Sequence, residues 1–189
     1  MLKKDLRNII FIVVLTLIIS GFCFKFLPSF PITSDTEEYD TVAFSLVQGK
    51  GLTPNNEPTK EPLGYPFFLA GIYYFFGYDW QIVKLIQFIL LAGMGIIIYL
   101  ITKKFLGFSS NLALLSSLTL IFWPYFVVYP LFIASEILFT FFLLLSIYFF
   151  LNFLRLPSLK NSLILGILLG IATLIRPVAL FLPFWLFGY

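Results

Sequence analysis

The sequence predicts an all-α fold, a polytopic transmembrane helical bundle with about five to six spans, for three reasons. Apolar residues make up 60% of the 189 positions and charged residues only 11%, whereas about a quarter of an ordinary soluble domain is charged. The 25 Phe, ten Tyr and three Trp exceed what a core of this size can bury. Several charge-free stretches also approach the length of a membrane span, about 20 residues.

The charged residues divide the apolar sequence into candidate spans. We expect spans near residues 9–27, 81–102, 109–129, 131–154 and 158–176, followed by the start of a sixth. A long charge-free stretch contains Pro124 and Pro130, which favour a division between the third and fourth spans. A cleaved signal peptide is the alternative for the first segment, but the end of that segment lacks a small-x-small cleavage site.

The placement of Lys and Arg predicts the orientation of the spans. The basic residues that precede the first expected span, or follow the second and the fourth, form three clusters: Lys3, Lys4 and Arg7; Lys103 and Lys104; Arg155 and Lys160. All three clusters fall on one side if residues 28–80 form a single external segment. We therefore expect a cytoplasmic amino terminus. We also expect a location in the plasma membrane.

Residues 28–80 are expected to form an external loop followed by an interfacial helix. Residues 28–61 carry six acids and two lysines, a net charge of −4. Residues 62–78 are apolar but too few to cross the membrane comfortably, and Pro66 suits a helix start. We expect this helix to lie at the outer membrane surface, with its tyrosines at headgroup depth.

The composition excludes several classes of function. No His is present, so Ser-His or Cys-His catalysis and His-ligated metals are excluded. The single Cys excludes an internal disulfide and a thiolate metal cluster. A net charge of +3 leaves no basic surface for nucleic acid. Chemistry or transport by carboxylates, Lys, Arg, hydroxyls and aromatic side chains remains, and no set of metal ligands stands out.

The acidic sequence SDTEEYD, residues 34–40, follows the first expected span and is the first candidate site. Three of its four carboxylates belong to Asp35, Glu37 and Glu38. Mutual repulsion and nearby lipid of low dielectric constant both raise carboxylate pKa values toward those that suit proton abstraction. A solvated acidic loop without chemistry is the alternative interpretation.

Two charges within apolar sequence are the other candidates. Glu136 lies near the outer end of the fourth expected span, where an acid costs about 2.5–3.5 kcal/mol and needs a partner or a polar cavity. Arg176 lies near the outer end of the fifth, before Pro177, which favours an irregular helix end. The two charges can form a structural ion pair, a functional pair or both. An Arg beside an acidic loop suggests an anionic ligand, and a phosphate at this depth most simply belongs to a lipid.

Several motifs follow one another in a specific order. They are Asp35 with Tyr39, then SLVQGKG, then EPLGYPFFLAGIYYFFG, then Ser135-Glu136, then GILLGIATLIRP ending in Arg176 and Pro177. In this order they resemble the GT-C superfamily of membrane glycosyltransferases. The resemblance is to the group that contains the dolichyl-phosphate-mannose protein mannosyltransferases and the bacterial aminoarabinose transferase of lipid A.

This resemblance implies an inverting glycosyltransferase. The donor would be a sugar linked to a polyprenyl phosphate in the membrane, and the acceptor a hydroxyl of a protein, lipid or wall glycan at the external face. Asp35 would be the base that deprotonates the acceptor, with Glu37 and Glu38 as alternative bases. A divalent cation stays open as a cofactor.

The resemblance also assigns substrate-binding residues. Arg176 would hold the lipid phosphate, with Lys60 as a second candidate, and Tyr39 and Tyr65 would position substrate. Glu136 would shape the cavity or contact the acceptor or a metal. Members of this superfamily have many more spans, so residues 1–189 are expected to be the amino-terminal part of the transmembrane domain, without the carboxy-terminal remainder.

Two other functions remain open at this stage. A transporter or flippase could use Glu136 and Arg176 as an intramembrane charge pair, although no paired broken helices are visible in the sequence. A non-catalytic remnant that retains the fold is the other alternative.

Overall fold

The computed structural model consists of helices, and the residues that it describes contain no strand. These residues are 3–27, 34–52 and 59–187, so parts of the expected external loop and the two residues at each end of the chain lie outside them. The predicted all-α helical bundle is confirmed for the described part of the chain.

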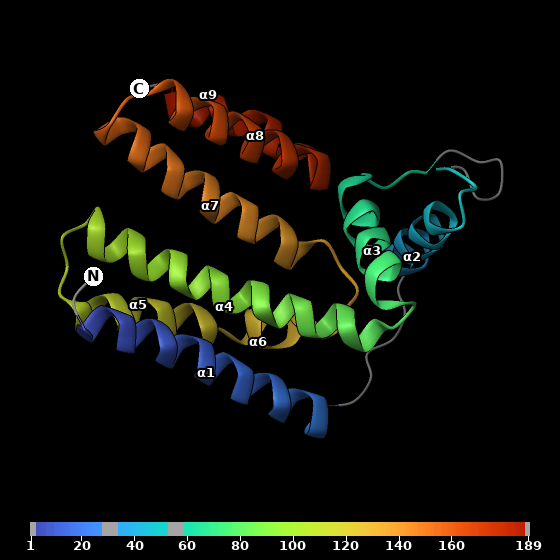
Figure 1. The fold of residues 1–189 in the computed structure, drawn as a ribbon, viewed down its shortest axis with the longest axis horizontal. Coiled ribbons are helices and arrows are strands. Elements are labelled where there is room, and N and C mark those ends of the chain that lie inside the picture. Colours follow the sequence, from blue (N-terminus) through green and yellow to red (C-terminus); the bar gives the residue numbers. More distant parts are fainter. Residues whose placement is uncertain (1–2, 28–33, 53–58, 188–189) are drawn as a thin grey trace.

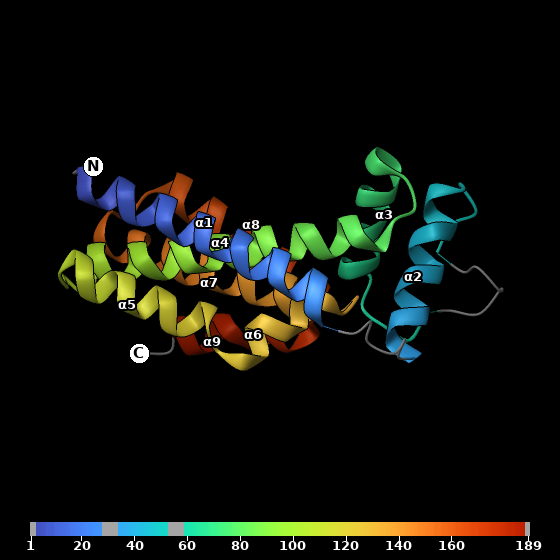
Figure 2. The same cartoon turned by 90° about the horizontal axis from the view of Figure 1, so that it is seen from below.

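The helices form a lengthwise bundle with a transverse cap. Their bounds are α1 Lys3–Phe26, α2 Ser34–Val47, α3 Gly64–Phe76, α4 Trp80–Lys104, α5 Ser110–Ile121, α6 Pro124–Val128, η1 Tyr129–Leu131, α7 Glu136–Arg155, α8 Leu159–Ile175, η2 Pro177–Phe181 and α9 Leu182–Phe187. Helices α1, α4, α5, α7 and α8 run along the long axis (Figure 1). Helices α2 and α3 lie side by side across one end of the bundle, as both views show (Figure 2).

The basic helix ends gather at the end of the bundle opposite this cap. Helix α1 begins at Lys3, α4 ends at Lys104 and α7 ends at Arg155, and all three ends lie together in Figure 1. The predicted orientation requires these three basic ends to lie on the same side of the membrane, and this arrangement agrees with it. Cations are also favoured at helix carboxyl ends because the helix dipole places partial negative charge there.

The described residues contain fewer full-length spans than the five to six expected. Helices α1, α4 and α7 are long and apolar enough to cross a membrane, and α5 with residues 124–131 makes a fourth if this pair, bent by 64°, counts as one span. Helix α8 is apolar but has only 17 residues. The expected third span is interrupted near Pro124, which begins a new helical segment. The expected fifth span, residues 158–176, is present as α8, which is shorter than the other spans and ends just before Pro177.

A fully buried side-chain amide forms hydrogen bonds with backbone carbonyls that the break between η1 and α7 leaves outside a helix. Gln87 of α4 donates from Nε2 to the carbonyl oxygens of Pro130, at 3.1 Å, and Phe132, at 2.6 Å. Its Oε1 accepts from the hydroxyl of Tyr65 at 3.3 Å. Non-helical backbone at membrane depth is tolerated only where its polar groups find partners. Gln87 supplies those partners, and the sequence analysis did not single it out.

The acidic segment after the first span is a helix where the sequence analysis expected a loop. In α2, Thr36, Tyr39 and Ala43 are buried on one face, at the spacing of successive helical turns. The helix ends at Val47, and Gly49 just beyond it has a φ of 71°, the left-handed conformation that favours glycine. Acidic residues flank this narrow buried stripe on both sides. The sequence of the segment therefore looks polar throughout, and the helical spacing of its few buried residues is hard to recognise.

Helix α3 begins against the backbone of α8. A Cβ on Gly64 would lie 2.6 Å from the backbone nitrogen of Ile175 and 2.7 Å from the carbonyl oxygen of Leu174. Only glycine allows this approach, which fixes the cap above the carboxyl end of α8. A helix is therefore present in the expected place, as α3, and its start is packed against the bundle.

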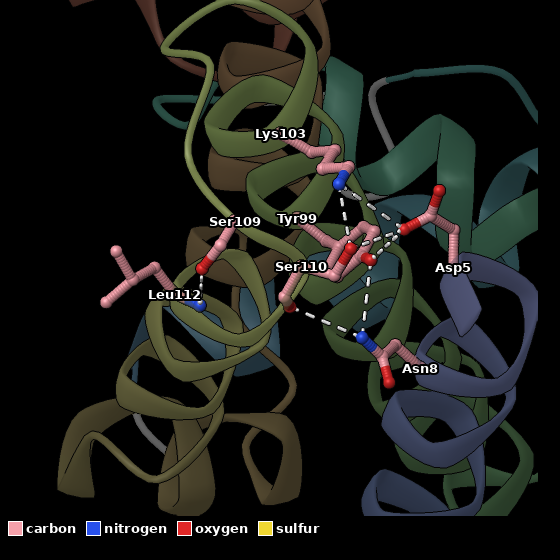
Figure 3. Close-up of polar contacts among 7 residues, drawn as sticks. All are labelled: Asp5, Asn8, Tyr99, Lys103, Ser109, Ser110 and Leu112. Carbon is pink, nitrogen blue, oxygen red and sulfur yellow. Dashed lines mark hydrogen bonds and ion pairs between the residues drawn. The ribbon is translucent and has the colours of Figure 1, made fainter. Parts of the chain in front are cut away.

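A polar cluster joins α1, α4 and α5 at the basic end of the bundle (Figure 3). Oδ1 of Asp5 accepts from the hydroxyls of Tyr99, at 2.7 Å, and Ser110, at 2.9 Å. Nζ of Lys103 lies 3.8 Å from the same oxygen and donates to Ser110, and the amide of Asn8 donates to Tyr99. These contacts fix the positions of α1, α4 and α5 relative to one another along the bundle axis at this end.

Replacing Gln87 should destabilise the bundle. Gln87→Leu removes the three hydrogen bonds that this side chain makes with Pro130, Phe132 and Tyr65, so we expect a loss of about 1–3 kcal/mol of unfolding free energy. Thermal unfolding of the purified protein in detergent measures it. Gln81→Leu, an exposed glutamine on the same helix, is the matched control; equal effects of the two substitutions would contradict this role of Gln87.

A second substitution tests the docking of the cap. Gly64→Ala forces α3 away from α8, and such overpacking typically costs about 1–3 kcal/mol. Gly71→Ala, in the same helix, meets no atom within 4 Å and should be neutral or slightly stabilising. Unfolding midpoints of the two variants give the comparison, and a Gly64→Ala protein as stable as Gly71→Ala would show that the contact is not constrained.

Candidate active site

A cavity of about 200 Å³ lies where α2, the segment before α7 and the carboxyl end of α8 meet. Figure 1 shows α2 at the end of the bundle where α8 ends and α7 begins. The polar side chains that line the cavity are Asp35, Thr36, Tyr39, Tyr129, Ser135, Glu136 and Arg176. They come from three regions far apart in the sequence, so the site is a product of the tertiary fold.

An ion pair spans α7 and α8 at one wall of this cavity. Nη2 of Arg176 lies 2.5 Å from Oε1 of Glu136, and its Nε donates to the hydroxyl of Ser135 at 3.1 Å. Arg176 follows the last residue of α8 in an extended conformation, with φ −144° and ψ 117°, because Pro177 disfavours helical geometry in the residue before it. Glu136 is the first residue of α7, where the helix dipole favours a negative charge.

Only one of the three candidate bases lines the cavity. Asp35 does so from the first turn of α2, whereas Glu37 is exposed and is not part of the lining. Glu38 is turned toward the chain that precedes α3, where Oε1 accepts from the hydroxyl of Thr59 at 2.5 Å and the N–H of Glu61 at 3.0 Å. The hydrogen bond from Thr59 is the main cause that lowers the pKa of Glu38. Glu38 thus holds two segments together.

The two candidate tyrosines occupy successive layers. Tyr39 lines the cavity, and its hydroxyl donates to Oε2 of Glu61 at 2.9 Å. Tyr65 lies behind it and is fully buried, with its ring edge-on to that of Tyr39 at a centroid distance of 5.0 Å. Burial raises the pKa of Tyr39 to about 12 and that of Tyr65 well above its ordinary value. Both hydroxyls therefore stay protonated at neutral pH and act as donors.

The structure brings together four of the eight residues that sequence analysis selected. These are Asp35, Tyr39, Glu136 and Arg176. The other four do not line the cavity: Glu37, Glu38, Lys60 and Tyr65. Lys60 is exposed, and its backbone N–H, not its ammonium group, donates to the carboxylate of Glu38.

Sequence reasoning missed two lining residues that have clear roles. Thr36 donates from Oγ1 to the carbonyl of Ile133 at 3.1 Å, which ties α2 to the segment before α7. Tyr129 lines the cavity and stacks on Tyr125, with ring centroids 3.8 Å apart. The spacing from Thr36 to Tyr39 would have revealed the first, had residues 34–47 been read as a helix. No local signal distinguishes Tyr129 from the many other aromatic residues.

No group of three or more Asp, Glu or Cys side chains within the described ranges is arranged to hold a metal ion. The carboxylates that line the cavity belong to Asp35 and Glu136, and the second of these is engaged with Arg176. The arrangement that remains is an acid on one wall and a fixed guanidinium on the other. Such a pair can accept a proton at one point and hold an anion at another.

Comparison with known proteins identifies the family. A family model described as dolichyl-phosphate-mannose-protein mannosyltransferase matches residues 60–189, more than half of the chain. The match includes Glu136 and Arg176, whereas Asp35 and Tyr39 precede it. No curated protein and no solved structure matches the chain. The chain belongs to the dolichyl-phosphate-mannose-protein mannosyltransferase family, which makes it a membrane glycosyltransferase of the GT-C type.

Proposed function

We propose that this chain carries the catalytic cavity of an inverting glycosyltransferase. The enzyme moves a sugar from a polyprenyl-phosphate donor to an acceptor hydroxyl of a protein, lipid or wall glycan. The reaction takes place on the external face of the plasma membrane, and the amino terminus is cytoplasmic. The observation that carries this proposal is the shared cavity of Asp35 and Arg176, an acid and a fixed cation from opposite ends of the sequence.

Asp35 serves as the general base in this proposal. Its carboxylate takes the proton of the acceptor hydroxyl as the acceptor oxygen attacks the anomeric carbon. The bond between that carbon and the phosphate oxygen breaks, and the polyprenyl phosphate leaves with the electron pair. One base is sufficient because attack and departure occur on opposite faces of the sugar, as in inverting glycosidases. A phosphate leaving group also needs less protonation than an alkoxide does.

Arg176 binds the donor phosphate while it keeps its ion pair. Its Nε and Nη2 are engaged by Ser135 and Glu136, and among the described residues Nη1 has no hydrogen-bond partner. The side chain is 39% exposed, so a ligand can reach it. Glu136 and Ser135 therefore fix the guanidinium plane, and the remaining N–H donors are available to hold an anion. Glu136 and Arg176 can thus form a structural ion pair between two helices and also bind the donor phosphate.

The surface beside Arg176 suits a lipid-linked donor. Val178, Leu180 and Phe181 follow it along the chain and are 63%, 59% and 60% exposed. An apolar polyprenyl chain can lie against these side chains while its phosphate reaches the guanidinium. A soluble nucleotide-sugar donor would gain nothing from such a surface.

The first prediction concerns the base. Asp35→Asn should lower sugar transfer at least about 100-fold, because general-base catalysis contributes about 10²–10⁴ in rate, and should leave donor binding nearly unchanged. Release of polyprenyl phosphate from polyprenyl-phosphate mannose, with membrane glycan extract as acceptor, measures transfer. Glu37→Gln, an exposed neighbour outside the cavity, should stay near wild type. Normal turnover by the Asp35→Asn protein would remove Asp35 as the base.

The second prediction concerns the anion site. Arg176→Gln should weaken binding of polyprenyl phosphate by about tenfold or more, because a hydrogen bond to a charged group contributes about 1.5–3 kcal/mol. Equilibrium binding of a radiolabelled polyprenyl phosphate to the purified protein gives the affinity. Lys84→Gln removes a cation outside the cavity and is the control. Unchanged affinity in the Arg176→Gln protein would place the phosphate elsewhere.

A further inference from the structure

Two cations flank one aromatic ring at the end of the bundle opposite the candidate active site. Lys104 is the last residue of α4 and Arg155 the last residue of α7. Nζ of Lys104 lies 5.1 Å from the ring centre of Phe105, and Cζ of Arg155 lies 4.7 Å from the same centre. We call Lys104, Phe105 and Arg155 the basic clamp.

The partners of both cations are neutral. Lys104 donates to Oδ1 of Asn152 at 2.7 Å and to the hydroxyl of Tyr148 at 3.4 Å. Nη2 of Arg155 donates to the carbonyl of Phe105 at 3.0 Å. These contacts hold the two side chains in place without cancelling their charge.

No carboxylate within the described ranges forms an ion pair with either cation. The acid at this end of the bundle is Asp5, which is engaged with Lys103, Tyr99 and Ser110 (Figure 3). The carboxyl ends of α4 and α7 supply about half a negative charge each. About one positive charge therefore remains uncompensated at the basic clamp, and a ligand of opposite charge would relieve the repulsion.

The surroundings of the clamp are apolar. Both cations are exposed, and the neighbouring Leu106, Leu154 and Leu156 are 58%, 58% and 71% exposed. A fixed pair of cations next to exposed leucines matches a ligand that has an anionic head and hydrocarbon chains. It does not match a small hydrophilic anion, which would leave the leucines in contact with water.

We propose that the basic clamp binds the phosphate of an anionic phospholipid in the leaflet at this end of the bundle. The guanidinium of Arg155 offers parallel donors to phosphate oxygens, and Lys104 contributes a point charge. Phe105 aligns the two cations through its ring. This site is separate from the cavity of Asp35 and Arg176, so it stands independently of the proposed transfer reaction.

Native mass spectrometry of the purified full chain tests the proposal. The protein is released from detergent with either dioleoylphosphatidylglycerol or dioleoylphosphatidylcholine, and retained lipid is counted. We expect wild type to retain the glycerol lipid in preference to the choline lipid. The double variant Lys104→Gln/Arg155→Gln should bind the glycerol lipid about 25-fold more weakly, about fivefold for each cation removed. Equal retention of the two lipids by wild type would overturn the proposal.

Two single variants separate a built site from general attraction to a basic surface. Lys160→Gln removes an exposed cation at the same end that belongs to no part of the clamp, so we expect less than about a twofold effect. Phe105→Leu keeps both charges but removes the ring that aligns them, and we expect about a fivefold loss. A loss in the Lys160→Gln protein as large as in the double variant, or no loss in Phe105→Leu, would show diffuse attraction and refute the clamp.

Competition identifies the source of the phosphate. Excess inorganic phosphate should leave the retained glycerol lipid unchanged, because the free ion makes no contact with the leucines. Displacement of the lipid by inorganic phosphate would show that the clamp takes a soluble anion, against the proposal. Melting curves of the variants that replace Lys104, Arg155 or Lys160 should match wild type, since these cations are exposed.

Discussion

The buried amide of Gln87 is the interaction on which the rest of the structure depends. The hydrocarbon core of a membrane contains no water that could form hydrogen bonds with exposed backbone groups. A chain can therefore leave the helical conformation there only where protein groups form those hydrogen bonds. Gln87 provides those partners for the carbonyls of Pro130 and Phe132 and accepts from Tyr65. The irregular segment that follows brings Ser135 to the cavity, and the same amide ties the cap to the bundle.

The cap depends on a second set of paired polar groups. Asp40 of α2 accepts from the hydroxyls of Tyr73 and Tyr78 and from the indole nitrogen of Trp80, at 2.5, 2.6 and 2.9 Å. Burial and this carboxylate raise the pKa of Tyr78 to about 12, so the phenol remains a donor. Glu38 and Asp40, two of the four acids that make the segment look like a solvated loop, thus hold helices and segments together. Asp35 lines the cavity.

The two ends of the bundle have opposite electrostatic character. Seven of the nine acids lie between Asp35 and Asp79, in the cap and the segments beside it, whereas the basic helix ends lie together at the far end. At the cap, hydroxyls and backbone N–H groups compensate most of the acids. At the far end, Asp5 compensates Lys103 but the clamp keeps an excess of positive charge. A polar reaction at one end and lipid binding at the other are consistent with this division.

The sequence by itself determined the membrane class and the helical architecture, because hydropathy is a local property of the chain. The order of its motifs also led to Tyr39, Glu136 and Arg176 as candidates, together with three alternative acids. The sequence could not determine which acid reaches the cavity. That choice depends on the path of α2, whose narrow buried stripe is hidden among charges, and on the approach of α3 to α8 that Gly64 permits. Only the tertiary structure placed Glu38 against Thr59 and Asp35 in the cavity, because contacts between distant segments leave no local periodicity.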